Sequence, residues 1–229
     1  MYTKQNIIDL KNAICIDNMT DEQIKNSLKS QFKGVKTVCA KKRASKNHKR
    51  YFYIGAGFDT ETTKFNDTAS FVYIWQFTIS DMTYYSRYIN KLSDFTLILS
   101  TVLGKKAKLL VYGANISYDF QFVKHYLDKQ ITFAFASEQR KILTYELNNN
   151  IIVMDCLGVW GSSLAKCTEY TTRKKLSGDL DYTKFRTSET KMTSKEMLYC
   201  IHDTLICSEL CICALDTYIK QGKKIPLRL

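Results

Sequence analysis

Four acidic residues in three separate segments have the chemistry and the spacing to bind divalent metal ions. Asp59 and Glu61 are one residue apart at the end of an apolar run, so a strand there would put both carboxylates on one face of a sheet. Asp119 follows another apolar run at a strand-to-helix crossing, and Asp203 lies in the last long helical segment. Mg²⁺ prefers oxygen ligands and usually takes one or two carboxylates with phosphate oxygens and water, so the first pair would make half a site. Taken singly, each acid also has a structural explanation: the pair could lie on a solvated edge strand, and Asp119 or Asn115 could cap a helix.

One tyrosine lies on the same expected helix as the last acid. Tyr199 and Asp203 are four residues apart, so a helix would bring both side chains to one face. The phenol could then orient or help to deprotonate an attacking water, while the carboxylate completes the metal ligands. The alternative is a packed tyrosine beside a surface acid.

The overall charge indicates a polyanionic partner. Lysine and arginine number 34 against 22 aspartates and glutamates, a formal net charge of +12, which favours nucleic acid first and an anionic membrane surface second. The sequence has no apolar run of about eighteen residues and no recognisable signal peptide. We therefore expect a cytoplasmic protein with no membrane partner, and 229 residues suffice for one compact body with an appendage.

The eight cysteines form no Cys-x-x-Cys pair and have no regularly spaced histidine partners. We therefore expect reduced, mostly buried thiols rather than disulfides or a zinc site. Cys200, Cys207 and Cys211 fall at i, i+7 and i+11 of one expected helix, and this spacing favours core packing over metal ligation.

The first fifty residues differ from the rest, and we interpret residues 1–50 as a basic N-terminal leader or extension. Thr20 is expected to cap a helix that starts at Asp21, with Gln23 at the capping-box position. A basic run without any acid follows this helix. A solvated, disordered leader and an arm that grips nucleic acid are both compatible with such a run. Its basic residues are Lys33, Lys36, Lys41, Lys42, Arg43, Lys46, Lys49 and Arg50.

From residue 51 the pattern alternates between strands and helices. Aromatic and β-branched runs predict strands, and apolar residues at helical spacing predict helices, with Gly104 at one helix end and Thr193 capping another helix. A three-stranded meander followed by helices and strands predicts an α/β fold with the acids at strand ends and on nearby helices. The expected strands are 51–54 leading into 57–59, 71–79, 84–89, 108–113 and a hairpin of 141–147 with 151–156. The expected helices are 92–103, 118–127, 162–170 and 193–219.

In their order along the chain, the three acidic segments resemble the three exonuclease motifs of the DEDD superfamily. The spacing of Tyr199 and Asp203 resembles that of the tyrosine subclass. The histidine subclass would have its histidine at the position of Leu198, so His202 is not expected to be catalytic. Two further segments resemble the exonuclease domain of protein-primed family B DNA polymerases, which occur in bacteriophages, adenoviruses and linear plasmids. They are Gly178-Asp179-Leu180-Asp181-Tyr182, and Asp155-Cys156-Leu157 followed by Ser163-Leu164-Ala165-Lys166.

The resemblance covers residues 51–222 and departs from the family at two places. Ser177 stands where the family has a lysine, with Lys174 and Lys175 a little upstream as candidates to replace it. Ala114 stands where the family often has a histidine, so contacts to the terminal nucleotide are expected to differ.

The resemblance implies a ribonuclease H-like mixed sheet flanked by helices, with an exonuclease domain in residues 51–222. Residues 223–229 resemble the start of a linker to a polymerase domain. The implied activity is 3′→5′ hydrolysis of single-stranded or frayed DNA 3′ ends to nucleoside monophosphates, as in proofreading. The implied partners are the DNA 3′ end, a polymerase domain or subunit and a terminal protein, but the chain has no polymerase motif of its own. Two ions, Mg²⁺ or Mn²⁺, would be held by Asp59, Glu61, Asp119 and Asp203, with Tyr199 positioning the water.

Contacts to the DNA strand are expected around these acids, because frayed strands are held by aromatic stacking and basic grooves. Phe122 is the weakest aromatic candidate, since such stripes more often belong to a core. Two other functions stay open: a ribonuclease with the same two-metal chemistry, and a non-catalytic DNA-binding replication module that acts through its basic leader. The expected DNA-binding residues are Thr60, Asn115, Tyr118, Ser163, Leu164, Lys174, Lys175 and Tyr182.

Overall fold

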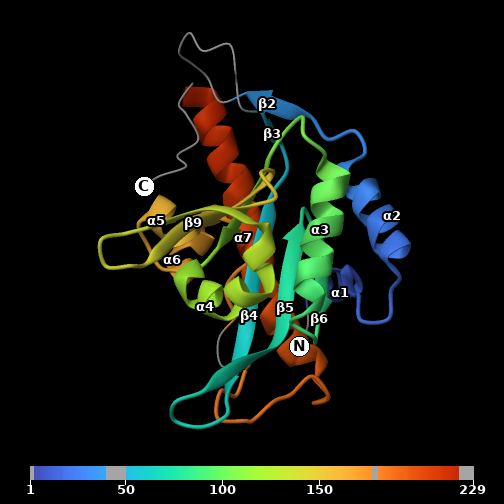
Figure 1. Cartoon of the computed structure of the whole chain (residues 1–229), viewed down its shortest axis with the longest axis vertical. Coiled ribbons are helices and arrows are strands. Elements are labelled where there is room, and N and C mark those ends of the chain that lie inside the picture. The colour runs from blue at the N-terminus through green and yellow to red at the C-terminus, as the bar shows by residue number, and fades with distance from the viewer. Residues whose placement is uncertain (1–2, 40–49, 177–179, 222–229) are drawn as a thin grey trace.

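The chain folds into one eight-stranded mixed sheet flanked by helices (Figure 1). The computed structural model describes residues 3–39, 50–176 and 180–221. The strand order is β1-β6-β5-β4-β7-β10-β9-β8, and β2 and β3 form a separate ribbon. The strands are β1 (Ala13–Cys15), β2 (Thr37–Cys39), β3 (Arg50–Phe52), β4 (Ala56–Lys64), β5 (Ser70–Ile79), β6 (Met82–Ser86), β7 (Leu109–Gly113), β8 (Ile131–Ala136), β9 (Ile142–Leu147) and β10 (Ile151–Asp155). The helices are α1 (Lys4–Lys11), α2 (Asp21–Phe32), α3 (Lys91–Leu103), α4 (Ile116–Leu127), α5 (Cys156–Trp160), α6 (Leu164–Cys167) and α7 (Ser194–Gln221), with single turns η1 (Asp128–Gln130) and η2 (Thr168–Tyr170).

The central strand β4 joins an antiparallel half of the sheet to a parallel one. β4, β5 and β6 form the predicted antiparallel meander, while β4 pairs in parallel with β7, and β7 with β10. β9 and β8 then close the other edge in antiparallel fashion. Because β4 has neighbours on both sides, it carries the first two acids into the middle of the fold.

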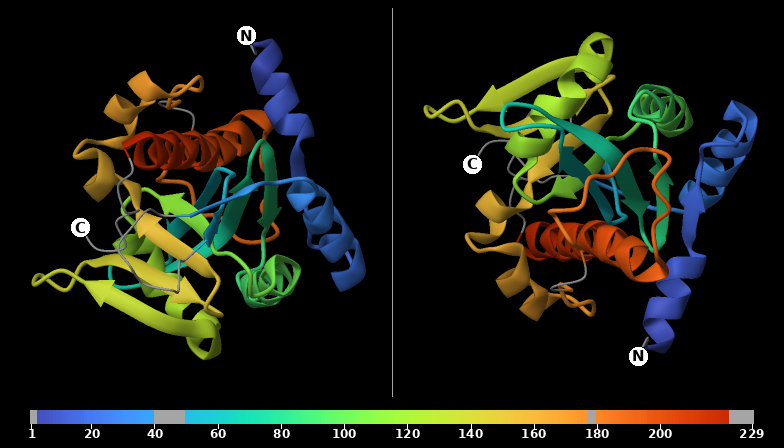
Figure 2. Two further views of the ribbon diagram at one scale, coloured as in Figure 1. Left: turned by 90° about the horizontal axis from the view of Figure 1, so that it is seen from above. Right: turned by 90° about the horizontal axis from the view of Figure 1, so that it is seen from below.

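Two layers of helices cover the sheet (Figure 2). On one face, Phe95 of α3 and Val123 of α4 belong to the same buried apolar cluster as Phe77 of β5. On the other face, Leu210 of α7 packs in a second cluster with Leu110 of β7. Both faces of the central strands are therefore buried, which accounts for their continuous apolar runs.

Helix α7 is long and apolar enough to span a membrane by length and composition alone, so the expectation that no segment would pass this test was wrong. However, 83% of its apolar window is buried inside the protein. Its apolar side chains face the sheet, as in the core helix of a globular fold. They include Cys200, Cys207 and Cys211, whose predicted core packing is confirmed by their burial.

Two glycines bring β4 into close contact with α7. A Cβ atom on Gly57 would lie 2.0 Å from the carbonyl oxygen of Thr204, and one on Gly55 would lie 2.2 Å from that of Ser208. Any side chain at these positions would push the helix away from the strand. The close approach places the residues that follow Gly57 beside the turn of α7 that contains Asp203.

Residues 3–39 pack onto the body of the protein. β1 pairs in parallel with β6, α1 contacts α7, and α2 contacts α3. The predicted capping box is confirmed, because the Gln23 N–H donates to Thr20 Oγ1 at 3.3 Å and the Thr20 N–H donates to Gln23 Oε1 at 2.8 Å. Most of the basic run lies at 40–49, outside the described residues, and the domain boundary at residue 50 stays a prediction.

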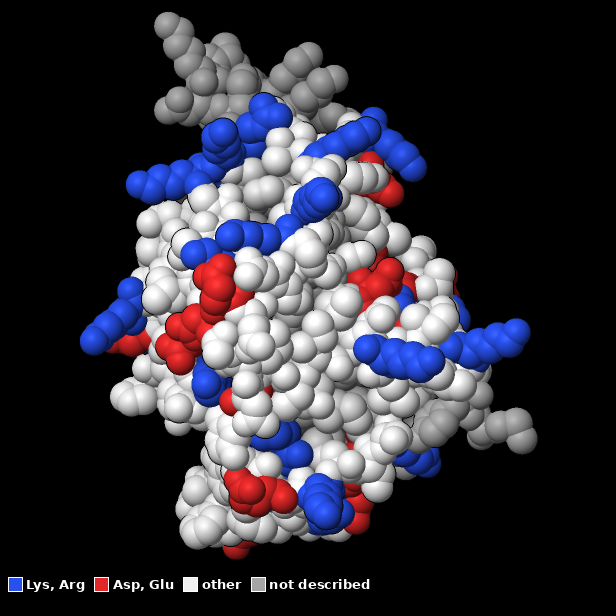
Figure 3. Space-filling model, turned by 90° about the vertical axis from the view of Figure 1, so that its right-hand side faces the viewer, with Lys and Arg blue, Asp and Glu red and all other residues white. Residues whose placement is uncertain are grey.

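Basic side chains do not form one continuous patch on the face shown in Figure 3. Lys and Arg gather toward the upper part of this face, and acidic side chains lie among basic ones further down. The charge on this face is therefore mixed rather than uniformly basic.

Candidate active site

Asp59 and Glu61 lie in the middle of β4. The expectation that the pair ends a strand was wrong, because β5 extends alongside and keeps β4 paired as far as Lys64. The register shifts between Glu61 and Thr62, which marks a bulge directly after the second acid. The strand period puts both acids on the same side as Gly57, which faces α7. Glu61 is buried and Asp59 is partly exposed.

Asp119 reaches β4 from α4, the helix on the other side of the sheet. Thr60, which separates the two β4 acids, donates its backbone N–H to Asp119 Oδ1 at 3.1 Å and its hydroxyl to the same atom at 2.5 Å. Both residues are buried. These bonds fix Asp119 beside β4, and they give Thr60 a structural partner where the sequence suggested a DNA contact.

Tyr199 and Asp203 lie on one face of α7, and Lys175 contacts both. The Lys175 ammonium forms an ion pair with Asp203 and lies 5.5 Å from the centroid of the Tyr199 ring. The hydroxyl oxygens of Tyr199 and Tyr182 are 2.8 Å apart. The sequence left a choice between Lys174 and Lys175. In the structure, Lys175 is the one that contacts the acids. The ammonium of Lys174 instead donates to backbone carbonyl oxygens outside this cluster.

The carboxyl groups of the cluster are electrostatically strained. Burial is the largest cause that raises the pKa of each of the four acids. The pKa of Glu61 is raised to about 8 and that of Asp119 to about 6. The pKa of Asp59 is raised further by the charges of Asp119, Glu61 and Asp203, whereas Lys175 acts to lower the pKa of Asp203. A positive charge placed among these groups would relieve the strain.

The donor set suits a divalent cation in its chemistry and its charge. Carboxylate oxygens are the ligands that Mg²⁺ and Mn²⁺ prefer, and mutual repulsion favours an ion that several acids can share. Within the described residues, no three His, Cys, Asp or Glu side chains converge on one metal position as they stand. Asp203 is turned to Lys175 and Asp119 to Thr60. Ion binding therefore requires carboxylates of this cluster to turn toward a shared position.

Five of the predicted DNA contacts are exposed at the surface: Asn115, Tyr118, Ser163, Lys174 and Tyr182. Tyr118 is 44% exposed and makes an edge contact with the ring of Phe122, and its hydroxyl is 2.7 Å from Thr62 Oγ1. Tyr182 is 65% exposed, and Ser163 is exposed as well. Exposed rings beside a basic surface can stack with nucleic-acid bases.

Leu164 and Asn115 differ in their placement. Leu164 is buried in the apolar cluster under α7, because α6 is a single turn that turns this side chain inward. Asn115 is exposed and occupies the N-cap of α4 with a left-handed backbone, but its side chain makes no capping bond. Its backbone N–H donates to Asp155 Oδ1 at 3.3 Å, which links the start of α4 to the end of β10.

The sequence did not single out Arg186, which is 2% exposed. Its guanidinium donates to the carbonyl oxygen of Asp181 at 2.5 Å and to Glu196 Oε1 at 2.7 Å. These bonds tie the segment that carries Tyr182 to the first turn of α7, and so hold Tyr182 against Tyr199. A lone buried arginine has no sequence pattern, so only its place just after the Gly-Asp-Leu-Asp-Tyr segment could have indicated it.

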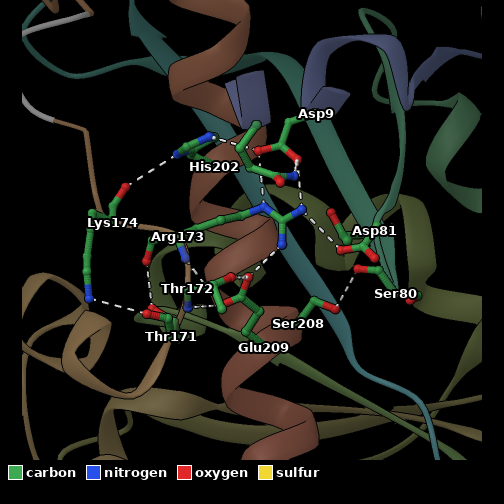
Figure 4. Close-up of polar contacts among 12 residues, drawn as sticks. Asp9, Ser80, Asp81, Thr171, Thr172, Arg173, Lys174, His202, Ser208 and Glu209 are labelled. Carbon is green, nitrogen blue, oxygen red and sulfur yellow. Dashed lines mark hydrogen bonds and ion pairs between the residues drawn. The ribbon is translucent and has the colours of Figure 1, made fainter. Parts of the chain in front are cut away.

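A buried ionic cluster lies beside the acids and includes the N-terminal helix (Figure 4). Arg173 donates to both carboxylate oxygens of Asp9 at 2.7 and 3.1 Å, to Glu209 at 2.5 Å and to Asp81 at 3.1 Å. His202 Nε2 lies 3.2 Å from Asp9 Oδ2. Asp9 and Arg173 are both buried, so their charges are shielded from water.

This ionic cluster holds two backbone segments that also carry residues of the acidic site. Arg173 precedes Lys175 by two residues, and His202 immediately precedes Asp203. His202 Nδ1 lies 3.3 Å from the carbonyl oxygen of Lys174, so the two segments also contact each other. His202 thus has structural partners. The ionic cluster fixes the backbone on which Lys175 and Asp203 lie.

Solved structures of the same fold come from phi29 DNA polymerase. Its complex with primer-template DNA and incoming nucleotide substrates is 15% identical, with a TM-score of 0.59 over 74% of this chain and 32% of that chain. Its complex with single-stranded DNA is 18% identical, with a TM-score of 0.55 over 73% of this chain and 32% of that chain. No protein-family model and no curated protein sequence matches the chain. The chain therefore spans about a third of that polymerase, and it shares with it a mixed α/β fold of the ribonuclease H-like kind.

Proposed function

We propose that this chain is a metal-dependent 3′→5′ exonuclease that hydrolyses single-stranded or frayed DNA 3′ ends to nucleoside monophosphates. The observation that carries the proposal is electrostatic: the charges of Asp119, Glu61 and Asp203 all raise the pKa of Asp59, and each of the four acids has a raised pKa. A divalent ion bound between such acids would offset the repulsion among their negative charges, so ion binding can replace protonation of the carboxyl groups. The likeness of the fold to part of a DNA polymerase supports DNA as the substrate.

Two ions, Mg²⁺ or Mn²⁺, would be held by the four acids of this cluster. When bound, they would supply activation of the attacking water and stabilisation of the departing 3′ oxygen. The pKa of Tyr199 is raised to about 12, mainly by burial, so its hydroxyl stays protonated at neutral pH. Tyr199 therefore acts as a hydrogen-bond donor that orients the reacting groups. Tyr182, 2.8 Å away, holds the Tyr199 hydroxyl in place.

In this proposal, exposed aromatic side chains would hold the DNA strand. Tyr118 directly precedes Asp119 and Tyr182 contacts Tyr199, and because both rings are exposed each can stack with an unpaired base. Lys175 adds a positive charge beside the acids that can face a phosphate once Asp203 turns to a metal. In a proofreading context the partners would be a polymerase domain or subunit and a terminal protein, in the cytoplasm.

The decisive experiment is digestion of a single-stranded DNA oligonucleotide by the full chain with Mg²⁺ or Mn²⁺. We expect a label at the 3′ end to be released as a mononucleotide, and a label at the 5′ end to report stepwise shortening. Asp59→Ala should reduce the rate by more than the ~10–100-fold that loss of an outer-shell partner costs. The matched control is Asp67→Ala, which removes an exposed acid from the loop after β4 and should leave the rate unchanged.

Three outcomes would contradict the proposal in different ways. Cleavage that persists in Asp59→Ala would remove the acid cluster from the mechanism. Faster digestion of a matched RNA oligonucleotide would make the chain a ribonuclease of the same chemistry. DNA binding without any cleavage by the wild-type chain would leave a non-catalytic binding module.

A further inference from the structure

Gln76 of β5 is a fully buried polar side chain without a partner. Its exposed fraction is 0%, and among the described residues neither its amide nitrogen nor its amide oxygen has a hydrogen-bond partner. Nearly all buried polar groups in folded proteins are paired, because leaving one unpaired costs free energy. An orphaned amide in the centre of a sheet therefore requires an explanation.

The position of Gln76 in the sheet connects it to the acidic site. In the register of β4 and β5, Gln76 lies directly opposite Asp59, so the two side chains emerge on the same face. Two residues further along β5, the Thr78 hydroxyl donates to Thr204 Oγ1 of α7 at 2.7 Å. Gln76 therefore lies under the same stretch of α7 that carries Asp203.

Core filling does not account for a glutamine at this position. Its neighbours on the same face of β5 are Ile74, which packs against Cys200, and Thr78, whose hydroxyl is fully engaged. A methionine has nearly the same length and shape as glutamine and would fill the space without burying an unpaired amide. The amide thus lowers the stability of the ion-free protein, a pattern typical of functional sites.

We propose that Gln76 is a positioning residue for Asp59, and that its amide N–H donates to the Asp59 carboxylate when that group binds a divalent ion. This inference rests on the proposed function. Carboxylates that ligate metals are themselves hydrogen-bonded by outer-shell groups, which orient them and set the affinity for the ion. Cross-strand neighbours are close enough for a glutamine to reach such a carboxylate. The amide oxygen remains free to accept from a water.

The test is the variant Gln76→Met, measured for thermal unfolding without metal and for Mn²⁺ affinity by titration calorimetry. We expect its melting temperature in EDTA to rise by about 2–4 °C, since the unpaired amide is removed. We expect its Mn²⁺ affinity to fall by about 10–100-fold. The two effects have opposite signs, whereas a residue with only a structural role would move stability alone.

The matched control is Thr78→Val, two residues away on the same face. Its hydroxyl has partners in Thr83 and Thr204, so this variant should lose stability and keep its Mn²⁺ affinity. An Mn²⁺ affinity of Gln76→Met equal to that of the wild type would overturn the positioning role. If the wild type binds Mn²⁺ and cleaves no nucleic acid, the proposed function fails, while the affinity comparison still decides the role of Gln76.

Discussion

Two tyrosine hydroxyls lie in contact near the acids. Tyr199 is buried on α7 and is held by Tyr182, whose segment is in turn clamped by Arg186. Because burial raises the pKa of Tyr199 to about 12, its hydroxyl is protonated at neutral pH, and in the proposed function it would donate a hydrogen bond rather than accept a proton. The likeness to the tyrosine subclass left this distinction open.

Replacement of Tyr199 by phenylalanine should therefore slow cleavage without unfolding the protein. We expect single-turnover rates on single-stranded DNA to fall by about 10²-fold, because the positioned donor is lost. Tyr182→Phe acts through Tyr199 and should cost less. The measurement is the rate at saturating Mn²⁺, with Tyr170→Phe, an exposed tyrosine, as the control. A full rate in Tyr199→Phe would exclude this tyrosine from the reaction.

Strand and helix spacing predicted which side chains share a face, but the choice of the four acids also rested on the resemblance of their order to the exonuclease motifs, and spacing did not predict their partners. Asp59 and Glu61 share a face because strands have a period of two, and Tyr199 and Asp203 because helices bring i and i+4 together. Lys175 pairs with Asp203, and Gln76 lies opposite Asp59, only because the fold brings distant segments together. No local pattern encodes such contacts, so sequence alone could offer Lys175 only as one of two choices and gave no sign of Gln76.

At the scale of elements, the N-terminal helix α1 contacts the segments that carry Lys175 and Asp203. Asp9 of α1 is buried, and its contacts with Arg173 and His202 lower its pKa well below the ordinary value. The interaction bridges α1, the segment after η2, and α7. The sequence suggested a leader or extension here, and that boundary stays a prediction, while residues 3–39 pack onto the body through β1, α2 and this cluster.

Asp9→Asn should destabilise the protein strongly, because it leaves the Arg173 charge buried with one fewer partner. We expect a loss of about 3–5 kcal/mol in the free energy of unfolding, measured by urea denaturation. The matched control is Glu22→Gln, which removes an exposed ion pair with Lys25 on α2 and should cost less than about 1 kcal/mol. Equal effects of the two variants would show that the ionic cluster does not hold α1.

Helices and strands could be predicted from the sequence where one of their faces is buried, because burial places apolar residues at a regular spacing. β5, α3 and the hairpin of β9 and β10 have apolar residues at strand or helix spacing over most of their length. Their predicted bounds agree with the structure to within a few residues. β8 was missed because it is an edge strand whose residues are mostly exposed, and such a strand has no buried face to impose alternation. α5, with five residues, is too short for a helical period to show.

For the molecule as a whole, a net charge of +12 is combined with a cluster of acids that are largely buried. In the proposed function, the net charge of +12 would attract a nucleic acid from a distance, while ionised carboxylates of the cluster would repel phosphate at close range. Metal ions would reverse the second effect, so DNA binding at the site and ion binding are coupled in the proposed function. The raised pKa values of these acids also make the stability of the whole protein depend on pH.

Without metal, the protein should lose stability as the pH rises from about 5 to about 8. The pKa of Glu61 is raised from 4.5 to about 8, so in this range the folded state keeps a proton that the unfolded chain has released. The free energy of unfolding then falls with pH, by up to about 1.4 kcal/mol per pH unit for such a group. Asp119, whose pKa is raised to about 6, adds to the fall up to that pH. Glu196, whose pKa is lowered to about 2, makes its full contribution already at pH 5 and leaves the slope unchanged.

Thermal unfolding in EDTA at pH 5, 6, 7 and 8 measures this dependence directly. Glu61→Gln removes the titrating carboxyl and should flatten the curve, while leaving the melting temperature at pH 5 nearly unchanged. Mn²⁺ binds the ionised carboxylates, so its stabilising effect should grow with pH and cancel the fall by pH 8. A melting temperature in EDTA that stays level or rises up to pH 8 would mean that the acids are ionised and paired without metal, and would count against the site as an ion-binding cluster.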